Sequence, residues 1–187
     1  MGKNQNPLNG EEFRHRKTLI VGEVRSGKTA YTLRVFQELR RSREGLLVVL
    51  DLAPERVEGV GGKLPLSDGE KEGILYLSPW IVPPRLKGKT EEEILRLAGE
   101  NRERIEPHLE TIRKSGASAL IINDLSLYFH AGDAPQLWLT VEKIPTVVMN
   151  GYYGRHFGEG SVSRKERGEM KWLMARCDRV LFLPPTP

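Results

Sequence analysis

Eight residues near the start of the chain have the types and spacing of a phosphate-binding loop. Gly22-Glu-Val-Arg-Ser-Gly-Lys-Thr29 matches the pattern of a glycine, four variable residues, and then Gly-Lys followed by Ser or Thr. The glycines of this pattern let main-chain amides turn inward around phosphate oxygens, where a Cβ atom would clash or forbid the required dihedral angles. The segment therefore predicts a P-loop that binds ATP or GTP.

The side chains of this loop divide the chemistry between them. Lys28 is predicted to place its positive charge against the β- and γ-phosphates, and Thr29 to offer its hydroxyl to Mg2+. The helix after the loop adds the positive end of its dipole. The predicted nucleotide-binding residues are Gly22, Glu23, Val24, Arg25, Ser26, Gly27, Lys28 and Thr29.

Two acidic residues each come after an apolar run that has the character of a buried strand. Asp124 comes after residues 119–122, and we expect it to hold Mg2+ through water beside the first loop. The alternative is an aspartate that caps the next turn. Asp51 comes after residues 46–50 and is predicted to be a catalytic base or a second metal anchor, with a turn-forming role before Pro54 as the alternative.

Further candidates lie at the same predicted edge of the sheet. Asn150 ends another apolar run, so its amide is predicted to sense the γ-phosphate or a bound water, unless it only ends the strand. The glycine-rich loop 151–160 is predicted to close over the base or to supply Arg155 to the transition state, with a plain surface loop as the alternative. His130 is close enough in sequence to Asp124 to line the same cleft, although a solvated histidine is the alternative.

The elements that must position these residues alternate between strand and helix. The predicted strands are 18–21, 46–50, 74–77, 119–122, 145–149 and 179–183, and the predicted helices are 28–41, 90–112, 135–143 and 163–175. Pro107 should kink or divide the second helix. Ser163 and Glu166 have the spacing of a capping box and are predicted to begin the last helix.

This alternation predicts an α/β fold, a three-layer sandwich with a mostly parallel central sheet. We expect residues 1–16 to form a flexible N-terminal arm and residues 17–187 to form a single domain, with an irregular region between Leu52 and Lys89.

The composition of the chain narrows the class of protein. A net charge of +4 with a pI near 9.2 suits an anionic ligand, but the basic residues are interleaved with glutamates, which disfavours a nucleic-acid surface. The single cysteine, Cys177, excludes an internal disulfide and a cysteine-based metal site. No apolar run is long enough to cross a bilayer, so a cytoplasmic protein without a membrane partner is expected.

The chain resembles the adenosylcobinamide kinase/guanylyltransferase family, a RecA-like group of P-loop proteins. The likeness lies in the Arg-Ser-Gly-Lys core of the P-loop, in Ile122-Asn-Asp-Leu-Ser-Leu-Tyr128, in residues 150–160, and in the final segment 175–183. The resemblance implies the fold, phosphate binding and the use of Mg2+. The family's guanylylated histidine has no counterpart, because residues 51–78 contain no histidine, and the guanylyltransferase reaction therefore lacks its nucleophile.

These observations lead to a main hypothesis and two alternatives. The main hypothesis is Mg2+-dependent binding of a nucleoside triphosphate and its hydrolysis, or transfer of its γ-phosphoryl group to a small acceptor, with Lys28, Asp124, Asp51, Asn150 and Arg155 as catalytic residues. The first alternative is a regulatory or assembly NTPase that acts on a protein or nucleic-acid partner, in which RecA-like homo-oligomers would place Arg155 across a subunit boundary. The second is a binding module that holds another anion without turnover.

Overall fold

The structure is a computed structural model that describes residues 8–42, 44–55 and 62–185. The expected N-terminal arm at residues 1–7 and the irregular region at residues 56–61 lie outside the described residues, as do residues 43 and 186–187.

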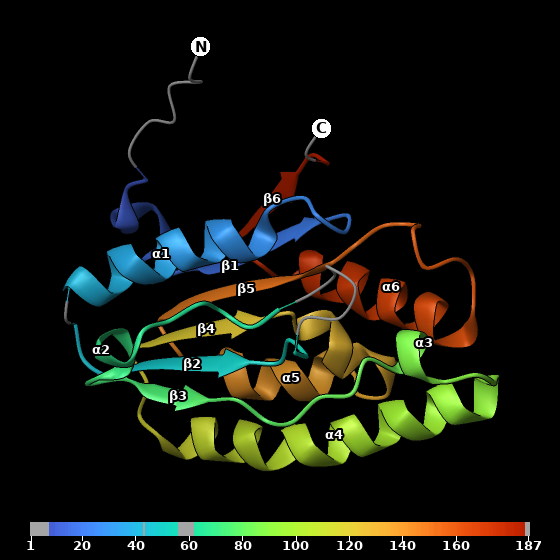
Figure 1. The fold of residues 1–187 in the computed structure, drawn as a ribbon. Coiled ribbons are helices and arrows are strands. Elements are labelled where there is room, and N and C mark those ends of the chain that lie inside the picture. Colours follow the sequence, from blue (N-terminus) through green and yellow to red (C-terminus); the bar gives the residue numbers. More distant parts are fainter. Residues whose placement is uncertain (1–7, 43, 56–61, 186–187) are drawn as a thin grey trace.

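A sheet of six strands, all parallel, forms the centre of the molecule (Figure 1). Its order is β3-β2-β4-β5-β1-β6. The strands are β1 Lys17–Gly22, β2 Leu47–Asp51, β3 Leu75–Leu77, β4 Ala119–Asn123, β5 Thr146–Tyr152 and β6 Arg179–Leu183. The predicted α/β class with a mostly parallel sheet is confirmed.

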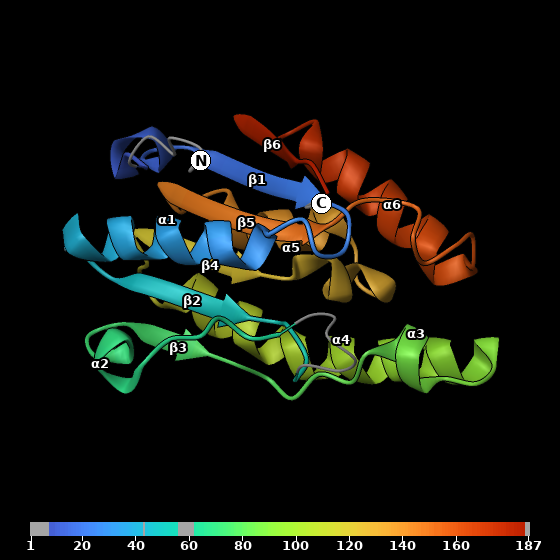
Figure 2. The same ribbon diagram turned by 45° about the horizontal axis from the view of Figure 1, so that its top comes forward.

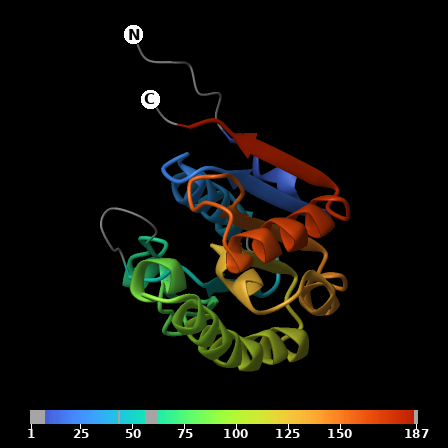
Figure 3. The ribbon, with the colours of Figure 1, turned by 90° about the vertical axis from the view of Figure 1, so that its right-hand side faces the viewer.

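Helices cover both faces of this sheet, which gives the expected three layers. The helices are α1 Lys28–Ser42, α2 Asp68–Lys71, α3 Pro84–Lys87, α4 Glu91–Lys114, α5 Ala134–Val141 and α6 Ser161–Met174, with short 3-10 helices η1 Gly10–Phe13 and η2 Leu125–His130. Helix α1 packs on one face, and α4, α5 and α6 lie on the other, as the end-on view shows (Figure 3).

Two hydrophobic clusters, one for each face of the sheet, result from the alternation of side chains along the strands. Leu19 and Val21 of β1 point into the cluster beneath α4, α5 and α6. Ile20, which lies between them, points into the cluster under α1. Strands buried on both faces require continuous apolar runs, which is the pattern seen in the sequence.

Because all the strands run the same way, their carboxyl ends meet at one edge of the sheet. The P-loop comes after β1 at this edge, the connection from β5 to α6 crosses it, and α3 lies beside it (Figure 1). Figure 2 shows α1 lying over the strands with its first turn at this end. In the sheet order, β5 lies between β1 and β4, and β2 is one strand further away.

Helix α4 is continuous through Pro107, so of the two effects predicted for this proline, a kink or a division of the helix, the division is wrong. Proline removes one amide donor, which leaves the carbonyl of the residue four positions earlier, Glu103, without its usual partner. Both Glu103 and Pro107 are exposed, so water can take this carbonyl.

Helix α6 begins at Ser161, with Gly160 as its N-cap and no side-chain capping hydrogen bond. The prediction of a capping box at Ser163 and Glu166 is therefore wrong, because both residues lie inside the helix and are buried. A complete capping box is instead present in the irregular region, between Ser67 and Glu70 at the start of α2.

The segment before β1 contacts the domain. Phe13 of η1 is fully buried and packs edge-on against Tyr31 of α1, with ring centroids 6.4 Å apart.

At the other end of the chain, Cys177 is a free, half-buried thiol, and burial raises its pKa to about 12, which keeps it protonated.

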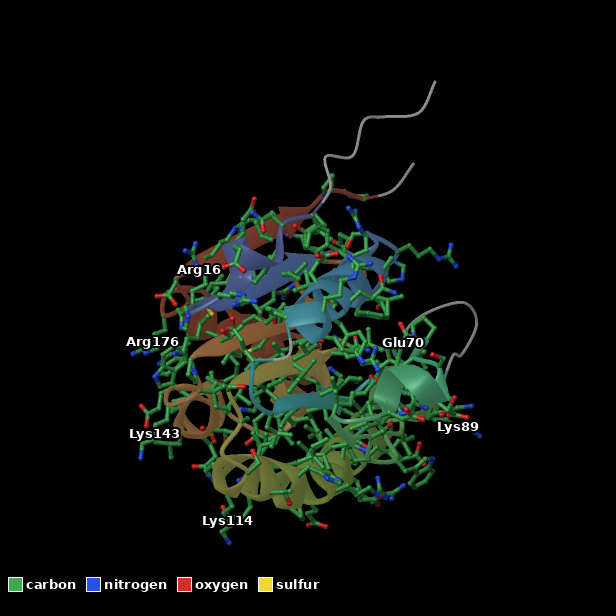
Figure 4. The ribbon with its side chains drawn as sticks, turned by 90° about the vertical axis from the view of Figure 1, so that its left-hand side faces the viewer. Arg16, Glu70, Lys89, Lys114, Lys143 and Arg176 are labelled. Carbon is green, nitrogen blue, oxygen red and sulfur yellow. The ribbon has the colours of Figure 1, made fainter. Side chains whose placement is uncertain are left out.

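The surface carries its charges in a dispersed way. Figure 4 views the molecule from the side opposite the P-loop, and the labelled side chains project outward from different elements. These are Arg16, Glu70, Lys89, Lys114, Lys143 and Arg176. Among the described residues, no helix has the length and apolar character needed to cross a membrane.

Candidate nucleotide-binding site

The P-loop has two glycines for two different physical reasons. A Cβ atom at Gly22 would lie 2.6 Å from Ser26 Oγ and 2.7 Å from the Leu183 carbonyl oxygen, so close packing demands glycine there. Gly27 has open space around it but a φ of +81°, which L-residues rarely adopt. The loop therefore requires these two glycines even without a ligand.

Lys28, the first residue of α1, folds back over the loop. Its Nζ donates hydrogen bonds to the carbonyl oxygens of Gly22 at 3.0 Å and Glu23 at 2.6 Å, and to Ser26 Oγ at 3.3 Å. Burial lowers the pKa of Lys28, an effect opposed by the charges of Asp124 and Glu23. The ammonium group is thus held at the mouth of the loop by neutral oxygens, which an anion can replace.

Asp124 comes directly after β4 in a left-handed conformation, with φ 57° and ψ 47°. Its main-chain N–H donates to Asn150 Oδ1 at 3.0 Å, and its carboxylate accepts one hydrogen bond, from Ser126 Oγ at 3.0 Å. Burial raises the pKa of this carboxyl, while Ser126 and Lys28 partly offset the effect. A carboxylate with so few donors has free lone pairs for a cation.

Asn150 of β5 lies at the centre of a buried hydrogen-bond network. Its Nδ2 donates to Thr32 Oγ1 and to Asn123 Oδ1, both at 2.8 Å, while its Oδ1 accepts from Asp124. The amide therefore ties the first turns of α1 to the ends of β4 and β5. Its polar atoms are engaged by protein groups, although the residue lines the cavity beside the P-loop.

Asp51 lies at the end of β2 and is fully buried. Its carboxylate accepts hydrogen bonds from Leu64 N at 2.7 Å, Tyr76 Oη at 2.8 Å, Asn123 Nδ2 at 2.8 Å and Ala53 N at 3.3 Å. It is not among the residues that line the cavity at the P-loop. The structure thus places Asp51 behind the site, where it holds the chain after β2.

Arg155 is exposed and lies outside the cavity lining. Its contact with the P-loop is made by the main chain, because Arg155 N–H donates to Glu23 Oε1 at 2.7 Å. Gly154 lies tightly against the same carboxylate, since a Cβ atom there would come within 2.2 Å of it. The loop 151–160 is therefore fastened to the second residue of the P-loop.

One cavity of about 380 Å3 joins these elements, and we call it the P-loop cavity. Residues 24–30 form one wall, the ends of β4 and β5 form its floor, and α3 with Phe157 forms the opposite wall. The cationic side chains in its lining are Arg25, Lys28 and Arg85. This surplus of positive charge around Asp124 suits a polyanion that is accompanied by a cation.

Arg85 of α3 is the arginine that the structure brings to the cavity opposite the P-loop. Its side chain is 14% exposed, and its guanidinium forms an ion pair with Glu166 Oε2 at 2.8 Å. The guanidinium carbon also lies 4.1 Å from the ring centroid of Phe157 and 5.5 Å from that of Tyr152. These contacts hold a permanent positive charge at the wall.

His130, at the end of η2, lines the same cavity. Of the two possibilities predicted for this residue, a place in the cleft of Asp124 or a solvated side chain, the structure shows the first. Its Nε2 lies 2.6 Å from Glu166 Oε2, and both side chains are 1% exposed. The residues that sequence reasoning missed are thus Arg85 and Glu166. Arg85 lies in a Pro-rich stretch that has neither helical nor strand periodicity. Glu166 has the spacing of a capping box with Ser163, so the sequence indicated a different role for it.

The residues near Asp124 fit a magnesium ion that is carried by phosphates. No group of three or more His, Cys, Asp or Glu side chains suited to a metal occurs among the described residues, so a fully protein-bound metal site is not supported there. Mg2+ usually keeps several waters and binds through one or two carboxylates together with substrate phosphates. Thr29 and Asp124 line one cavity and offer this donor set.

Comparisons with known proteins identify the class of fold to which the structure is similar. No protein-family model matches the chain, and no curated protein matches it. The structure of the flagellar accessory protein FlaH from Methanocaldococcus jannaschii is similar, with a TM-score of 0.51 and 12% identity over 90% of this chain and 71% of FlaH. Pif1 helicase from Candida albicans matches with a TM-score of only 0.38 and 13% identity, over 98% of this chain and 40% of the helicase, and supports no inference.

The chain has a RecA-like P-loop NTPase fold. The parallel sheet order, the P-loop between β1 and α1, and the likeness to FlaH agree on this class. At 12% identity, the likeness to FlaH extends to the fold alone.

Proposed function

We propose that this chain binds a Mg2+–nucleoside triphosphate in the P-loop cavity and hydrolyses it, and that the nucleotide state regulates or assembles a partner. The observation that carries the proposal is that Lys28, Thr29 and Asp124, separated by almost a hundred residues, line a single cavity of about 380 Å3. A turn that only connected β1 to α1 would need neither the lysine nor a half-buried carboxylate beside it in the same cavity.

Each residue then has a defined task. Amides of the loop and the start of α1 cradle the phosphates, and Lys28 exchanges its carbonyl partners for phosphate oxygens. Thr29 and Asp124 would hold Mg2+, which neutralises charge on the phosphates. Asn150 positions Asp124 through the hydrogen bond to its main-chain N–H. We assign Asp51 a structural role, because donors already surround its carboxylate.

The regulatory role is supported by the connection between the P-loop and the loop 151–160. Glu23 belongs to the P-loop, and its carboxylate binds the main chain at Arg155. Any shift of the P-loop on binding phosphate would therefore move an exposed loop that a partner can read. The fold neighbour FlaH is named a flagellar accessory protein, which agrees with a supporting role more than with metabolite synthesis.

A small-molecule kinase is the second candidate function. It is favoured by the wall that faces the P-loop, where Pro83, Pro84 and Leu86 add apolar surface on which an acceptor can pack. The resemblance to adenosylcobinamide kinase/guanylyltransferase proteins points the same way. A kinase would transfer phosphate to an added acceptor, whereas a regulatory NTPase would hydrolyse faster with its partner.

The proposal is tested by measuring the binding and hydrolysis of Mg2+-ATP and Mg2+-GTP by the parent chain and by Lys28→Ala. We expect the variant to lose at least about tenfold in affinity and to release no phosphate, because it lacks the charge that faces the triphosphate. Lys87→Ala is the matched control, since Lys87 is an exposed lysine on α3. Equal binding and phosphate release by Lys28→Ala and the parent would refute the proposal.

A further inference from the structure

Arg85 of α3 makes an incomplete ion pair with Glu166 of α6. Its Nη2 lies 2.8 Å from Glu166 Oε2, but the second carboxylate oxygen, Oε1, is buried and has no hydrogen-bond partner among the described residues. Arginine and carboxylate frequently pair through two parallel hydrogen bonds, one to each oxygen. A guanidinium placed only to neutralise Glu166 would use both oxygens, so this one-sided contact indicates that the arginine has a second task.

The other contacts of the guanidinium hold it in place and leave most of its donors unused. Nη1 donates to Ser163 Oγ at 3.3 Å, and the guanidinium carbon lies 4.1 Å from the ring centroid of Phe157 and 5.5 Å from that of Tyr152. The rings take up no donor, because the attraction is between the positive charge and the ring. A guanidinium has five N–H donors, and the contacts with Ser163 and Glu166 use two of them. Within the described parts of the chain, three donors are left for an acceptor.

Arg85 lies on the side of the P-loop cavity where the terminal phosphate and its Mg2+ are expected. It lines this cavity together with Asp124, Ser126 and Tyr152. The N–H of Tyr152, whose ring lies beside the guanidinium, donates to Ser126 Oγ at 3.1 Å, and Ser126 Oγ donates to Asp124 Oδ1 at 3.0 Å. Burial raises the pKa of the Asp124 carboxyl and the charge of Glu166 raises it further, so the ion pair is within electrostatic reach of the proposed metal ligand.

We propose that Arg85 is a catalytic residue of the NTPase reaction and that it contacts the γ-phosphate from the wall opposite the P-loop. This inference rests on the proposed function. The triphosphate then lies between two cations in one cavity, Lys28 on the P-loop side and Arg85 on the α3 side. Arg25, which also lines the cavity, is exposed and belongs to the P-loop wall, and Arg155 lies outside the lining.

Arg85 acts on the charge that develops during hydrolysis. The oxygen of the attacking water bonds to the γ-phosphorus, and one of its protons passes to solvent. The bond between the γ-phosphorus and the β,γ-bridging oxygen breaks, and its electron pair stays on the nucleoside diphosphate. An arginine that stabilises the negative charge of this transition state contributes about 10³–10⁵-fold to turnover in other P-loop NTPases. The guanidinium stays charged throughout, so Arg85 acts by charge and hydrogen bonds and transfers no proton.

This position predicts an effect that depends on the third phosphate. A nucleoside diphosphate ends at the β-phosphate, which the P-loop and Lys28 hold, so its binding should not depend on Arg85. Vanadate bound beside the diphosphate occupies the place of the γ-phosphoryl group in the transition state, so that complex should depend on Arg85 strongly. An arginine that only joined α3 to α6 would affect both complexes alike.

The test compares Arg85→Ala with the parent. Turnover is measured with Mg2+-ATP and Mg2+-GTP, and affinity with Mg2+ and the corresponding diphosphate, with and without vanadate. We expect turnover and the affinity for the vanadate complex each to fall at least about 100-fold, while the affinity for the diphosphate alone stays within about twofold. Lys87→Ala is the matched control and should behave like the parent, because it removes one positive charge from the same helix at an exposed residue outside the cavity lining.

Arg85→Lys adds a comparison that keeps the positive charge and removes the planar fork. Its turnover should lie between that of Arg85→Ala and that of the parent. Parent-like turnover in Arg85→Ala would overturn the inference. So would equal losses of affinity with and without vanadate, which would mark the arginine as structural. Loss of turnover in Arg155→Ala but not in Arg85→Ala would assign the role to Arg155 instead.

A measurement on the unmodified protein decides the matter if the variants do not fold. Nitrogen-15 NMR of the arginine side chains should show a shift of the Arg85 signal when vanadate is added to the complex with Mg2+ and the diphosphate. An unchanged Arg85 signal would overturn the inference. A parent chain that binds neither nucleotide would instead refute the proposed function itself, which separates the two failures.

Discussion

Two aspartates at the ends of neighbouring strands, Asp51 after β2 and Asp124 after β4, have similar sequence surroundings and very different environments. The carboxylate of Asp51 accepts hydrogen bonds from two main-chain amides, a tyrosine and an asparagine. That of Asp124 accepts one, from Ser126, and it faces the P-loop cavity. A buried carboxylate with a full set of donors stabilises the fold, whereas one that lacks them is available to a cation.

The difference arises from the path of the chain after each strand. After β2 the chain returns to the strand end, so that Leu64 and Tyr76 bring donors to Asp51. After β4 the chain turns at once into η2, with Asp124 itself in the left-handed conformation. Position at the carboxyl edge of a parallel sheet is therefore not enough to define a site residue; the unsatisfied carboxylate is the better guide.

The largest effect is expected for Asp51→Ala. Removing this carboxylate leaves several buried donors unpaired, each worth about 1–3 kcal/mol, so the free energy of unfolding should fall by about 3–5 kcal/mol. Urea denaturation measures this change. The folded fraction should bind nucleotide as the parent does. A variant of normal stability that has lost turnover would place Asp51 in the chemistry and break the comparison.

The second effect concerns Asp124→Asn, which keeps the shape of the side chain and removes its charge. Asparagine tolerates the left-handed conformation, so the fold should persist. Turnover at a fixed Mg2+ concentration should fall about 100-fold, which corresponds to about 2.7 kcal/mol in the activation free energy. A Mg2+ titration of phosphate release checks the result, with Glu103→Gln as the control because Glu103 is exposed on α4. Unchanged magnesium dependence would contradict the metal role.

The third prediction is a pH dependence of stability. Burial raises the pKa of Asp124, so the folded state favours the protonated carboxyl. Without Mg2+ or nucleotide, the contribution of Asp124 to stability is greatest below the usual aspartate pKa of about 3.9 and is lost as the pH rises through its higher folded value, by at most about 1.4 kcal/mol per pH unit. Unfolding of the parent and Asp124→Asn across this range should diverge in that direction; parallel curves would show that the carboxyl is not perturbed.

The smallest effect is expected for Tyr76→Phe, which removes one donor from Asp51 and leaves the others. The free energy of unfolding should fall by about 1 kcal/mol, because the remaining donors keep the carboxylate solvated by the protein. Urea denaturation of the variant and the parent, measured side by side, resolves such a change in the free energy of unfolding. A loss as large as that of Asp51→Ala would mean that the hydroxyl alone holds the carboxylate, and that the main-chain donors contribute little.

Prediction from sequence was strongest where the pattern is local. Apolar runs of strand length alternate with segments of helical periodicity, and this pattern predicted the α/β class and every strand of the sheet. Strands that are buried on both faces require such continuous apolar runs. The loop between β1 and α1 was equally clear in the sequence, because local geometry requires glycine at Gly22 and Gly27. Pro107 does not divide α4, and the carbonyl that it leaves without a donor, that of Glu103, lies on an exposed residue where water can bind it.

Other features could not be derived from local patterns. Arg85 and Arg155 both lie in sequence segments rich in glycine or proline. Tertiary contacts, an ion pair with Glu166 and the ring of Phe157, hold Arg85 at the cavity, while Arg155 stays exposed. Glu166 matched a capping box by spacing, yet it lies inside α6 and pairs with His130.

By itself, the sequence determined the class of fold and the glycine-bounded loop between β1 and α1, because both depend on periodicity and on backbone geometry within a few residues. Only the tertiary structure decided which polar side chains face that loop and which are already satisfied. Hydrogen-bond partners such as Leu64 for Asp51, or His130 for Glu166, come from distant parts of the chain. Whether a buried carboxylate supports the fold or is left for a ligand depends on those partners.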